Sequence, residues 1–306
     1  MSKESGVIEI TNKKYPKALK QALSVLVPSS GPKKLYYKGN WSDDIFKNCL
    51  AVVGSRHLTY YGRKATEQIV TECAAAGITI VSGFMYGGDE AAHLAAVKCG
   101  GKTIAVMPCG IDLIHPANQK NLYQEILNNN GLVVSEYEGS AQPQNFTYVQ
   151  RDRLVAGLSK AVLVTEAALN SGSLITASYA KKYNRKVFAV PGQITSEVSR
   201  GTLKLIKEGA EPVADASDIL SYFKVLVNQG VNQVDRAPSS QNFVSSGLTK
   251  TGSLEQKIIA QLKREALRAD EMARIFNVPV AQLGTTLSLM QLKGQILQDF
   301  GKYYIS

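Results

Sequence analysis

The sequence lacks several features that would assign it to a membrane or secreted class. No uncharged apolar run approaches the ~20 residues that cross a bilayer. The N-terminus, MSKESGVIEI, has no apolar stretch of the secretory type. The four cysteines form no C-x-x-C pair, which argues against a zinc ribbon or a disulfide framework. We therefore expect a cytoplasmic protein with no membrane span.

Common cofactor and metal motifs are also missing. There is no G-x-G-x-x-G for a dinucleotide, and Gly101-Lys102-Thr103 lacks the earlier glycine of a Walker A loop because position 96 is Ala96. His57, His93 and His115 do not have the spacing of metal ligands. We predict no catalytic residues, no metal and no cofactor.

Acidic residues are outnumbered by basic ones, and the net charge is +10 over 306 residues. The excess is concentrated at the two ends, with +5 in residues 1–49 and +3 in residues 250–306. Such a balance favours an anionic partner, nucleic acid first. A solvated basic surface without a partner gives the same charge, so charge alone leaves both interpretations open.

Apolar residues make up 44% of the chain and charged residues 20%, a globular composition. Apolar segments and helical patterns alternate from residue 49 to about 220. The segments are continuous rather than alternating, as in parallel strands covered on both faces. This predicts an α/β fold with an open, doubly wound, mainly parallel sheet. The expected strands are 49–53, 78–82, 103–107, 132–135, 161–165 and 187–190, and the expected helices are 60–76, 90–99, 118–128, 151–158, 173–182 and 202–207.

The chain is long enough for two or three domains. Residues 226–252 lose periodicity and gain Asn, Gln, Ser and Gly, which predicts a linker. Residues 253–306 show three short helices and a terminal hairpin, a winged helix-turn-helix pattern. Residues 49–225 then form the central α/β domain, and residues 1–48 form its N-terminal extension or edge.

Small and hydroxyl residues follow several predicted strands. Gly54-Ser55-Arg56, Ser82-Gly83 and Ser171-Gly172-Ser173 all fall at the carboxyl edge of the sheet or at a helix start. Ligands of doubly wound sheets bind at that edge, where helix N-termini offer N–H groups to an anion. A phosphate-bearing ligand is favoured. Arg56 could bind that phosphate, or it could pair with a nearby carboxylate.

Residues 144–153, QNFTYVQRDR, place Phe146 and Tyr148 beside Arg151 and Arg153. Aromatic rings beside arginines suit a stacked base and its phosphate. A buried ring with surface charges would give the same pattern, so both interpretations stay open.

Taken in order, a set of blocks resembles a known family. The blocks are VGSR (53–56), SGFMYGGDEAAH (82–93), GKTIAVMPCGIDLIHPANQKNL (101–122), RDRLVAGLS (151–159), EAALNSGSLITA (166–177), VFAVPG (187–192) and LIKEGA (205–210). They resemble the DNA-processing protein A (DprA/Smf) family over residues 15–220, and the C-terminal pattern is similar to the winged-helix domain of many members.

The resemblance implies an extended Rossmann-like domain that binds single-stranded DNA without enzymatic turnover. It implies a homodimer that protects incoming single-stranded DNA and loads RecA recombinase during natural transformation. The DNA-binding positions that it implies are Gly54, Ser55, Arg56, Ser82, Gly83, Tyr148, Arg151, Arg153, Ser171, Gly172 and Ser173. The implied dimer surface lies near Leu205 and Ile206.

The sequence departs from the family pattern at several positions. Met85–Asp89 replaces Ala-Arg-Gly-Ile-Asp, Asp152 stands between the two arginines where Asn is usual, and Asn145 replaces a frequent basic residue. Gly201-Thr202-Leu203 replaces the usual Gly-x-Asn.

Two other functions remain as alternatives. A nucleotide-processing enzyme of the phosphoribohydrolase type would need a strand-end acid, for which Glu136 and Glu166 are the candidates. A ligand-sensing transcription regulator would use residues 250–306 to bind duplex DNA. Its recognition helix would be Val280–Leu292, which contains no Lys or Arg, and this favours protein contact or weak duplex contact over specific binding.

Overall fold

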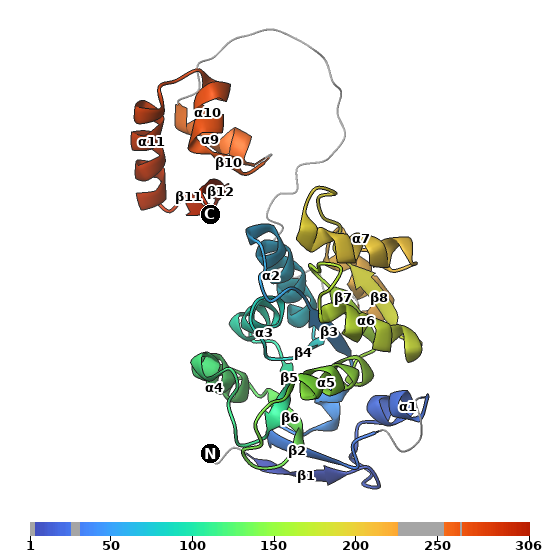
Figure 1. The fold of residues 1–306 in the computed structure, drawn as a ribbon. Helices are drawn as coiled ribbons and strands as arrows, with labels where there is room; N and C mark the ends of the chain where they lie inside the picture. Colours follow the sequence, from blue (N-terminus) through green and yellow to red (C-terminus); the bar gives the residue numbers. More distant parts are fainter. Residues whose placement is uncertain (1–3, 26–30, 226–253, 264) are drawn as a thin grey trace. The chain divides into compact units, whose positions relative to one another are not determined.

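The computed structural model describes residues 4–25, 31–225, 254–263 and 265–306. The chain divides into two compact units near residue 231 (Figure 1). The predicted linker, residues 226–252, falls outside the described residues. No helix within the described ranges is long and apolar enough to cross a membrane.

The first unit is built on a nine-stranded sheet in the order β1-β2-β6-β5-β4-β3-β7-β8-β9. The strands from β6 to β9 in that order pair in parallel, which confirms the predicted doubly wound sheet. They are β3 (Cys49–Val53), β4 (Thr79–Ser82), β5 (Thr103–Gly110), β6 (Leu132–Tyr137), β7 (Ala161–Val164), β8 (Lys186–Ala189) and β9 (Glu211–Pro212).

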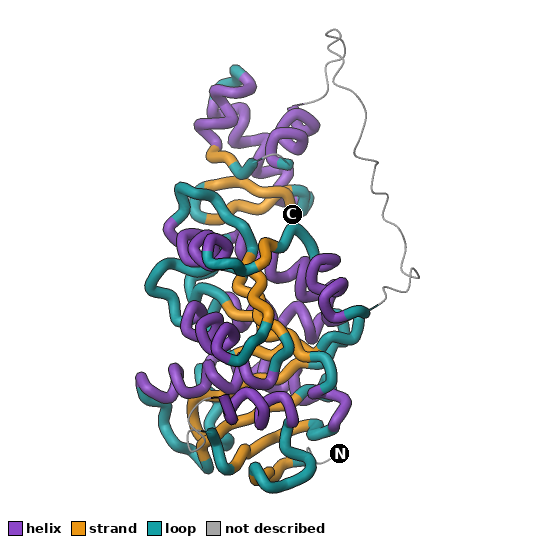
Figure 2. Tube along the Cα trace, turned by 90° about the vertical axis from the view of Figure 1, so that its right-hand side faces the viewer, coloured by secondary structure: helices purple, strands orange, loops and turns teal. Residues whose placement is uncertain are grey.

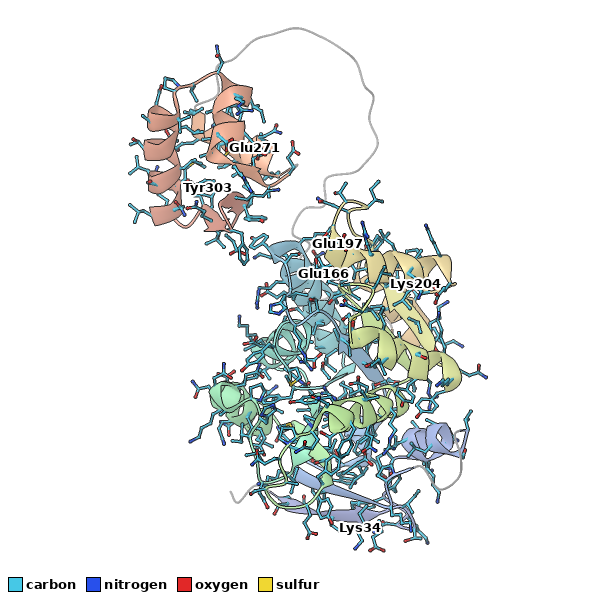
Figure 3. The ribbon with its side chains drawn as sticks, in the orientation of Figure 1. Lys34, Glu166, Glu197, Lys204, Glu271 and Tyr303 are labelled. Carbon is cyan, nitrogen blue, oxygen red and sulfur yellow. The ribbon has the colours of Figure 1, made fainter. Side chains whose placement is uncertain are left out.

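Two antiparallel strands extend one edge of this sheet. β1 (Ser5–Glu9) pairs with β2 (Lys34–Gly39), and β2 pairs with β6. Buried and partly exposed residues alternate along β2, as expected for a strand with one wet face. Lys34 pairs with Glu9 at 3.5 Å on this edge (Figure 3). The N-terminal extension is therefore part of the sheet.

Helices cover both faces of the sheet (Figures 1 and 2). One face carries α1 (Lys17–Val25), α5 (Asn145–Leu158), α6 (Ser173–Lys182) and α7 (Arg200–Lys207). The other carries α2 (Tyr60–Ala75), α3 (Gly88–Lys98), α4 (Lys120–Asn128) and α8 (Ala216–Phe223). Three short 3-10 turns complete the unit: η1 (Asp43–Phe46), η2 (Ala117–Gln119) and η3 (Glu197–Ser199).

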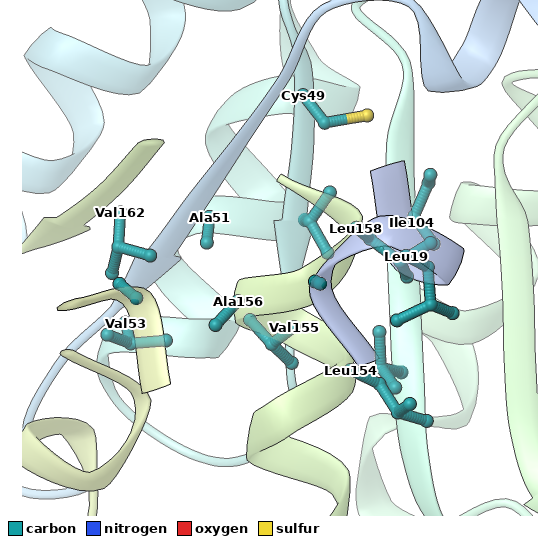
Figure 4. Packing of buried hydrophobic residues seen from close by; sticks show 14 of the residues in the cluster. Leu19, Cys49, Ala51, Val53, Ile104, Leu154, Val155, Ala156, Leu158 and Val162 are labelled. Carbon is teal, nitrogen blue, oxygen red and sulfur yellow. The ribbon is translucent and has the colours of Figure 1, made fainter. Parts of the chain in front are cut away.

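The central strand β3 shows why its sequence is a continuous apolar run. Ala51 and Val53 pack toward Val155 and Ala156 of α5 (Figure 4). Leu50 and Val52 pack on the opposite face against α2 and α3. Because successive side chains point to opposite faces, a strand buried on both sides has no polar position.

The second unit is the predicted winged helix. Its elements are α9 (Leu254–Leu262), β10 (Leu267–Arg268), α10 (Ala269–Phe276), α11 (Val280–Leu292), β11 (Ile296–Asp299) and β12 (Lys302–Ile305). The strands form a sheet in the order β10-β12-β11. Ile258, Met272, Leu283, Leu287 and Met290 form the centre of its core.

Candidate nucleic-acid interface

A cleft of about 710 Å³ opens at the carboxyl ends of β3, β4 and β7. Its walls come from the loop after β3, the loop between β4 and α3, the first turns of α5 and the start of α6. The cleft thus lies where the sheet architecture predicts a ligand. Of the predicted site residues it is lined by Gly54, Ser55, Arg56, Gly83, Tyr148, Arg151, Ser171, Gly172 and Ser173.

Helix α5 supplies one wall of the cleft, and it begins at Asn145 rather than at the predicted residue 151. Its start is fixed by Gln144 and Thr147: the Gln144 N–H donates to Thr147 Oγ1 at 3.0 Å, and that hydroxyl donates to the Gln144 carbonyl at 2.8 Å. The extra turns bring Asn145, Tyr148 and Val149 onto the cleft wall.

Tyr148 is held in a fixed position by two contacts. Its hydroxyl forms a hydrogen bond of 2.8 Å with His115 Nε2. The guanidinium carbon of Arg56 lies 5.3 Å from the centre of its ring, a cation–π contact. Burial, and then the positive charge of Arg56, lower the pKa of His115, so the imidazole is neutral at pH 7. The cleft therefore presents an oriented aromatic ring beside an exposed arginine.

The loop that carries Arg56 is fixed by its backbone. Ser55 N–H donates to the Glu166 carbonyl at 2.8 Å, and the Ser55 carbonyl accepts from Gly88 N–H at 3.0 Å. Gly87 has φ +74°, and a Cβ there would lie 2.2 Å from the Ser55 carbonyl oxygen. The departure at Gly88, where the family pattern has Ile, is compatible with this close contact, since a Cβ there would lie 2.6 Å from Gly54 Cα.

Arg151 forms part of the cleft floor and is 4% exposed. Its NH1 group donates to the Val106 carbonyl at 3.1 Å, and its Nε lies 3.1 Å from Asp152 Oδ1. Asp89 Oδ2 is 3.9 Å away. A Cβ at Gly83 would lie 1.6 Å from Arg151 NH1, so glycine leaves the space that the guanidinium occupies. These contacts make Arg151 a buried residue that shapes the pocket floor.

Two predicted residues lie outside the cleft. Arg153 is buried on the other side of α5, where its NH2 group pairs with Glu136. Ser82 is fully buried, and its hydroxyl donates to the Val52 carbonyl at 2.6 Å. The arrangement gives Arg153 and Ser82 structural contacts, and any contact of theirs with DNA stays a prediction.

At the start of α6 the N–H groups of Leu174 and Ile175 donate to the carbonyls of Ser171 and Gly172 at 3.1 and 2.9 Å. Gly172 is the N-cap residue and, as a glycine, provides no side-chain cap. Ser171 Oγ lies 2.8 Å from Ser173 Oγ and 3.4 Å from Ser173 N. A Cβ at Gly172 would meet no atom within 4 Å. The two serine hydroxyls at this helix N-terminus suit an oxyanion.

Two carboxylates face the single guanidinium of Arg151. Burial raises the pKa of Asp152 to about 6, while the charge of Arg151 opposes the rise and that of Asp89 adds to it. Burial also raises the pKa of Asp89, and Arg151 and the Met85 N–H oppose that rise. The cleft thus contains acceptor groups as well as the exposed cation of Arg56.

The acids considered for enzymatic turnover lie outside the cleft lining. Glu136 pairs with Arg153. Glu166 is 2% exposed and accepts from Thr59 N at 2.9 Å and Thr59 Oγ1 at 2.6 Å, which fixes the start of α2. Across the described residues, no group of three or more His, Cys, Asp or Glu is placed to hold a metal ion.

The predicted dimer residues differ in exposure. Leu205 is 5% exposed and packs in the core, whereas Ile206 is partly buried. Only Ile206 has surface left for a partner.

The sequence patterns did not identify three side chains at the cleft, those of His115, Asp89 and Asp152. His115 was considered only as a metal ligand, and Asp89 and Asp152 were not assigned to the lining. The spacing of Asn145, Tyr148 and Asp152 by three and four residues carries the missing information, because such positions share one face of a helix.

The fold and cleft define a class: a Rossmann-like protein with a phosphate-type edge and an appended winged helix. The family model for DNA recombination-mediator protein A matches residues 6–224, and that for the DprA winged helix domain matches residues 246–302. The chain belongs to the DprA/Smf family of DNA-processing proteins.

Individual relatives agree with this assignment. DprA of Streptococcus pneumoniae is 43% identical over 194 residues, which cover 63% of this chain and 67% of that protein. Smf of Escherichia coli is 36% identical over 254 residues, covering 83% of this chain and 67% of that protein.

Solved structures show the same fold. The S. pneumoniae DprA structure has a TM-score of 0.64 at 38% identity and covers 71% of this chain and 74% of its own. DprA of Helicobacter pylori, described for its single-stranded DNA binding mode, has a TM-score of 0.62 at 32% identity, covering 72% of this chain and 96% of its own.

Proposed function

We propose that this protein binds single-stranded DNA in the cleft between α5, α6 and the loop after β3. One observation carries the proposal: Tyr148 is held by His115 at 2.8 Å with Arg56 beside its ring. A base would stack on Tyr148, and Arg56 and the serine hydroxyls at the N-terminus of α6 would hold phosphates. The solved structures of S. pneumoniae and H. pylori DprA share this fold, and the H. pylori protein is described as binding single-stranded DNA.

In this proposal the protein is a recombination mediator, not an enzyme. It protects incoming single strands and loads RecA recombinase on them during natural transformation, acting in the cytoplasm as a homodimer. The burial of Glu136 and Glu166 in structural contacts supports this choice over a nucleotide-processing enzyme.

The binding step is tested by fluorescence anisotropy with a labelled oligonucleotide, single-stranded and duplex, over a salt series. Arg56→Ala should weaken single-strand binding on all sequences and lower the salt slope by about 0.7, as expected for one lost phosphate contact. Arg274→Ala is the matched control, since Arg274 is an exposed arginine on α10. If Arg274→Ala weakens binding and Arg56→Ala does not, the result would favour the alternative function of a transcription regulator that binds duplex DNA.

The proposed loading of RecA on single strands is tested in a separate assay. RecA-dependent strand pairing on a single strand should rise when the wild-type protein is added, and Arg56→Ala should remove the gain. A protein that binds single strands but leaves RecA pairing unchanged would limit the function to DNA protection.

A further inference from the structure

The cleft wall carries a carboxylate, that of Asp152, which has no role in phosphate binding. Asn145, Tyr148 and Asp152 lie on one face of α5, at intervals of three and four residues. Asp152 is one turn beyond Tyr148, so the two side chains are neighbours on the cleft wall. A base stacked on the Tyr148 ring would bring its edge within reach of the Asp152 carboxylate.

This carboxylate has hydrogen-bonding capacity to spare. Asp152 Oδ1 lies 3.1 Å from Arg151 Nε, and the side chain is 14% exposed. The same guanidinium also faces Asp89 at 3.9 Å and donates to the Val106 carbonyl. One buried cation is therefore shared between two carboxylates, while an ionised carboxylate offers about four acceptor sites.

An acceptor of this kind repels phosphate and attracts N–H groups. Guanine presents N1–H and an N2 amino group side by side, which match the two oxygens of a carboxylate. Thymine presents a single N3–H between two carbonyl oxygens, and both oxygens are repelled by a carboxylate. Bases in single strands expose these edges to protein side chains.

We propose that Asp152 makes the cleft selective, so that the base stacked on Tyr148 is guanine in preference to thymine. The proposal rests on the proposed single-strand binding and adds a base preference to it. Asp152 acts here as a specificity residue, and Arg151 positions its carboxylate.

The test compares the full chain on three labelled strands: all thymine, the same strand with every third base replaced by 7-deazaguanine, and that strand with inosine instead. Deazaguanine keeps both donors and prevents quadruplexes, whereas inosine lacks the N2 amino group. The wild type should bind the deazaguanine strand about tenfold more tightly than thymine, as for one bidentate base contact. The affinity for the inosine strand should lie between those for the deazaguanine and thymine strands.

Asp152→Asn should bind thymine at least as tightly as the wild type does and lose the guanine preference. Asp112→Asn is the control, because Asp112 pairs with Lys38 at the surface, and it should keep the preference. Since burial raises the pKa of Asp152 to about 6, the wild-type preference should also fall from pH 7.5 to pH 5. Arg151, Asp89 and Arg56 are the charged groups that face it.

Equal binding of thymine and deazaguanine strands by the wild type would overturn the selectivity and leave the proposed function standing. An unchanged preference in Asp152→Asn would overturn it equally. Failure of the wild type to bind any strand would instead reject the proposed function, and the selectivity with it.

Discussion

At the residue scale, the proposed single-strand binding depends on the ring of Tyr148. Tyr148→Ala should weaken single-strand binding by about 1–3 kcal/mol through loss of base stacking. Tyr148→Phe keeps the ring but removes the hydrogen bond to His115, so it should lose much less. Titration of each variant with a labelled strand measures both effects.

The control for this prediction lies on the same helix. Phe146 is 59% exposed and does not line the cleft. Phe146→Ala should bind like the wild type, and a loss as large as that of Tyr148→Ala would move the stacking site away from the cleft.

The burial of Asp152 is expected to make the stability of the folded protein depend on pH. The pKa of Asp152, raised by burial from 3.8 to about 6, means that the folded state binds its proton more tightly than the unfolded state. This group therefore lowers stability as pH rises from about 4 to 6, by up to about 3 kcal/mol at pH 8. Asp152→Asn removes that penalty, so urea unfolding should show the variant more stable than the wild type at pH 8 and little different at pH 4.

A change in stability of the opposite sign would contradict this prediction. An Asp152→Asn variant less stable than the wild type at pH 8 would show that the ion pair with Arg151 contributes more than burial of the carboxylate costs.

At the element scale, the corner after β4 determines whether α5 can dock. A Cβ at Gly83 would occupy the site of the Arg151 guanidinium, 1.6 Å from NH1. Gly83→Ala should displace Arg151 and leave Asp89 and Asp152 without their buried partner, at about 3–5 kcal/mol. Urea unfolding measures the loss. Gly172→Ala is the control, since a Cβ there meets no atom within 4 Å, and it should unfold like the wild type.

Helix α7 carries the two residues that are predicted to lie at the dimer surface. Ile206 is partly exposed, and Leu205 packs inside the protomer. If the homodimer forms through this surface, Ile206→Lys should shift the molecule from dimer to monomer in light scattering, with the melting temperature little changed. Lys207→Ala, one residue away, should stay dimeric. A dimer that persists in Ile206→Lys would place the interface elsewhere.

The sequence predicted elements best where one physical cause dominates. Continuous apolar runs identified β3 through β8 because both faces of these strands are buried. The first turns of α5 were missed because Gln144 and Thr147 cap the helix without the usual Ser or Asp signal. Strands β1 and β2 were missed because their pairing is antiparallel and one face is wet.

At the scale of the whole molecule, the sequence located the sheet edge but not the charge balance within it. Nine predicted residues line one cleft. Arg151 and Arg153 are adjacent in the pattern yet point to different carboxylates, Asp152 and Glu136. Tertiary packing determines which cation is exposed, and here it is Arg56. Composition and spacing do not contain that information.

At the same scale, we expect single-stranded DNA to stack in the cleft of the first unit. This stacking is tested by photocrosslinking the full chain to a guanine-free single strand of thymine and iodouracil, followed by mass spectrometry of the crosslinked peptide. We expect a crosslink at Tyr148 that is weaker in Arg56→Ala at the same protein concentration. Crosslinks confined to residues 254–306, with Tyr148 unmodified, would contradict it.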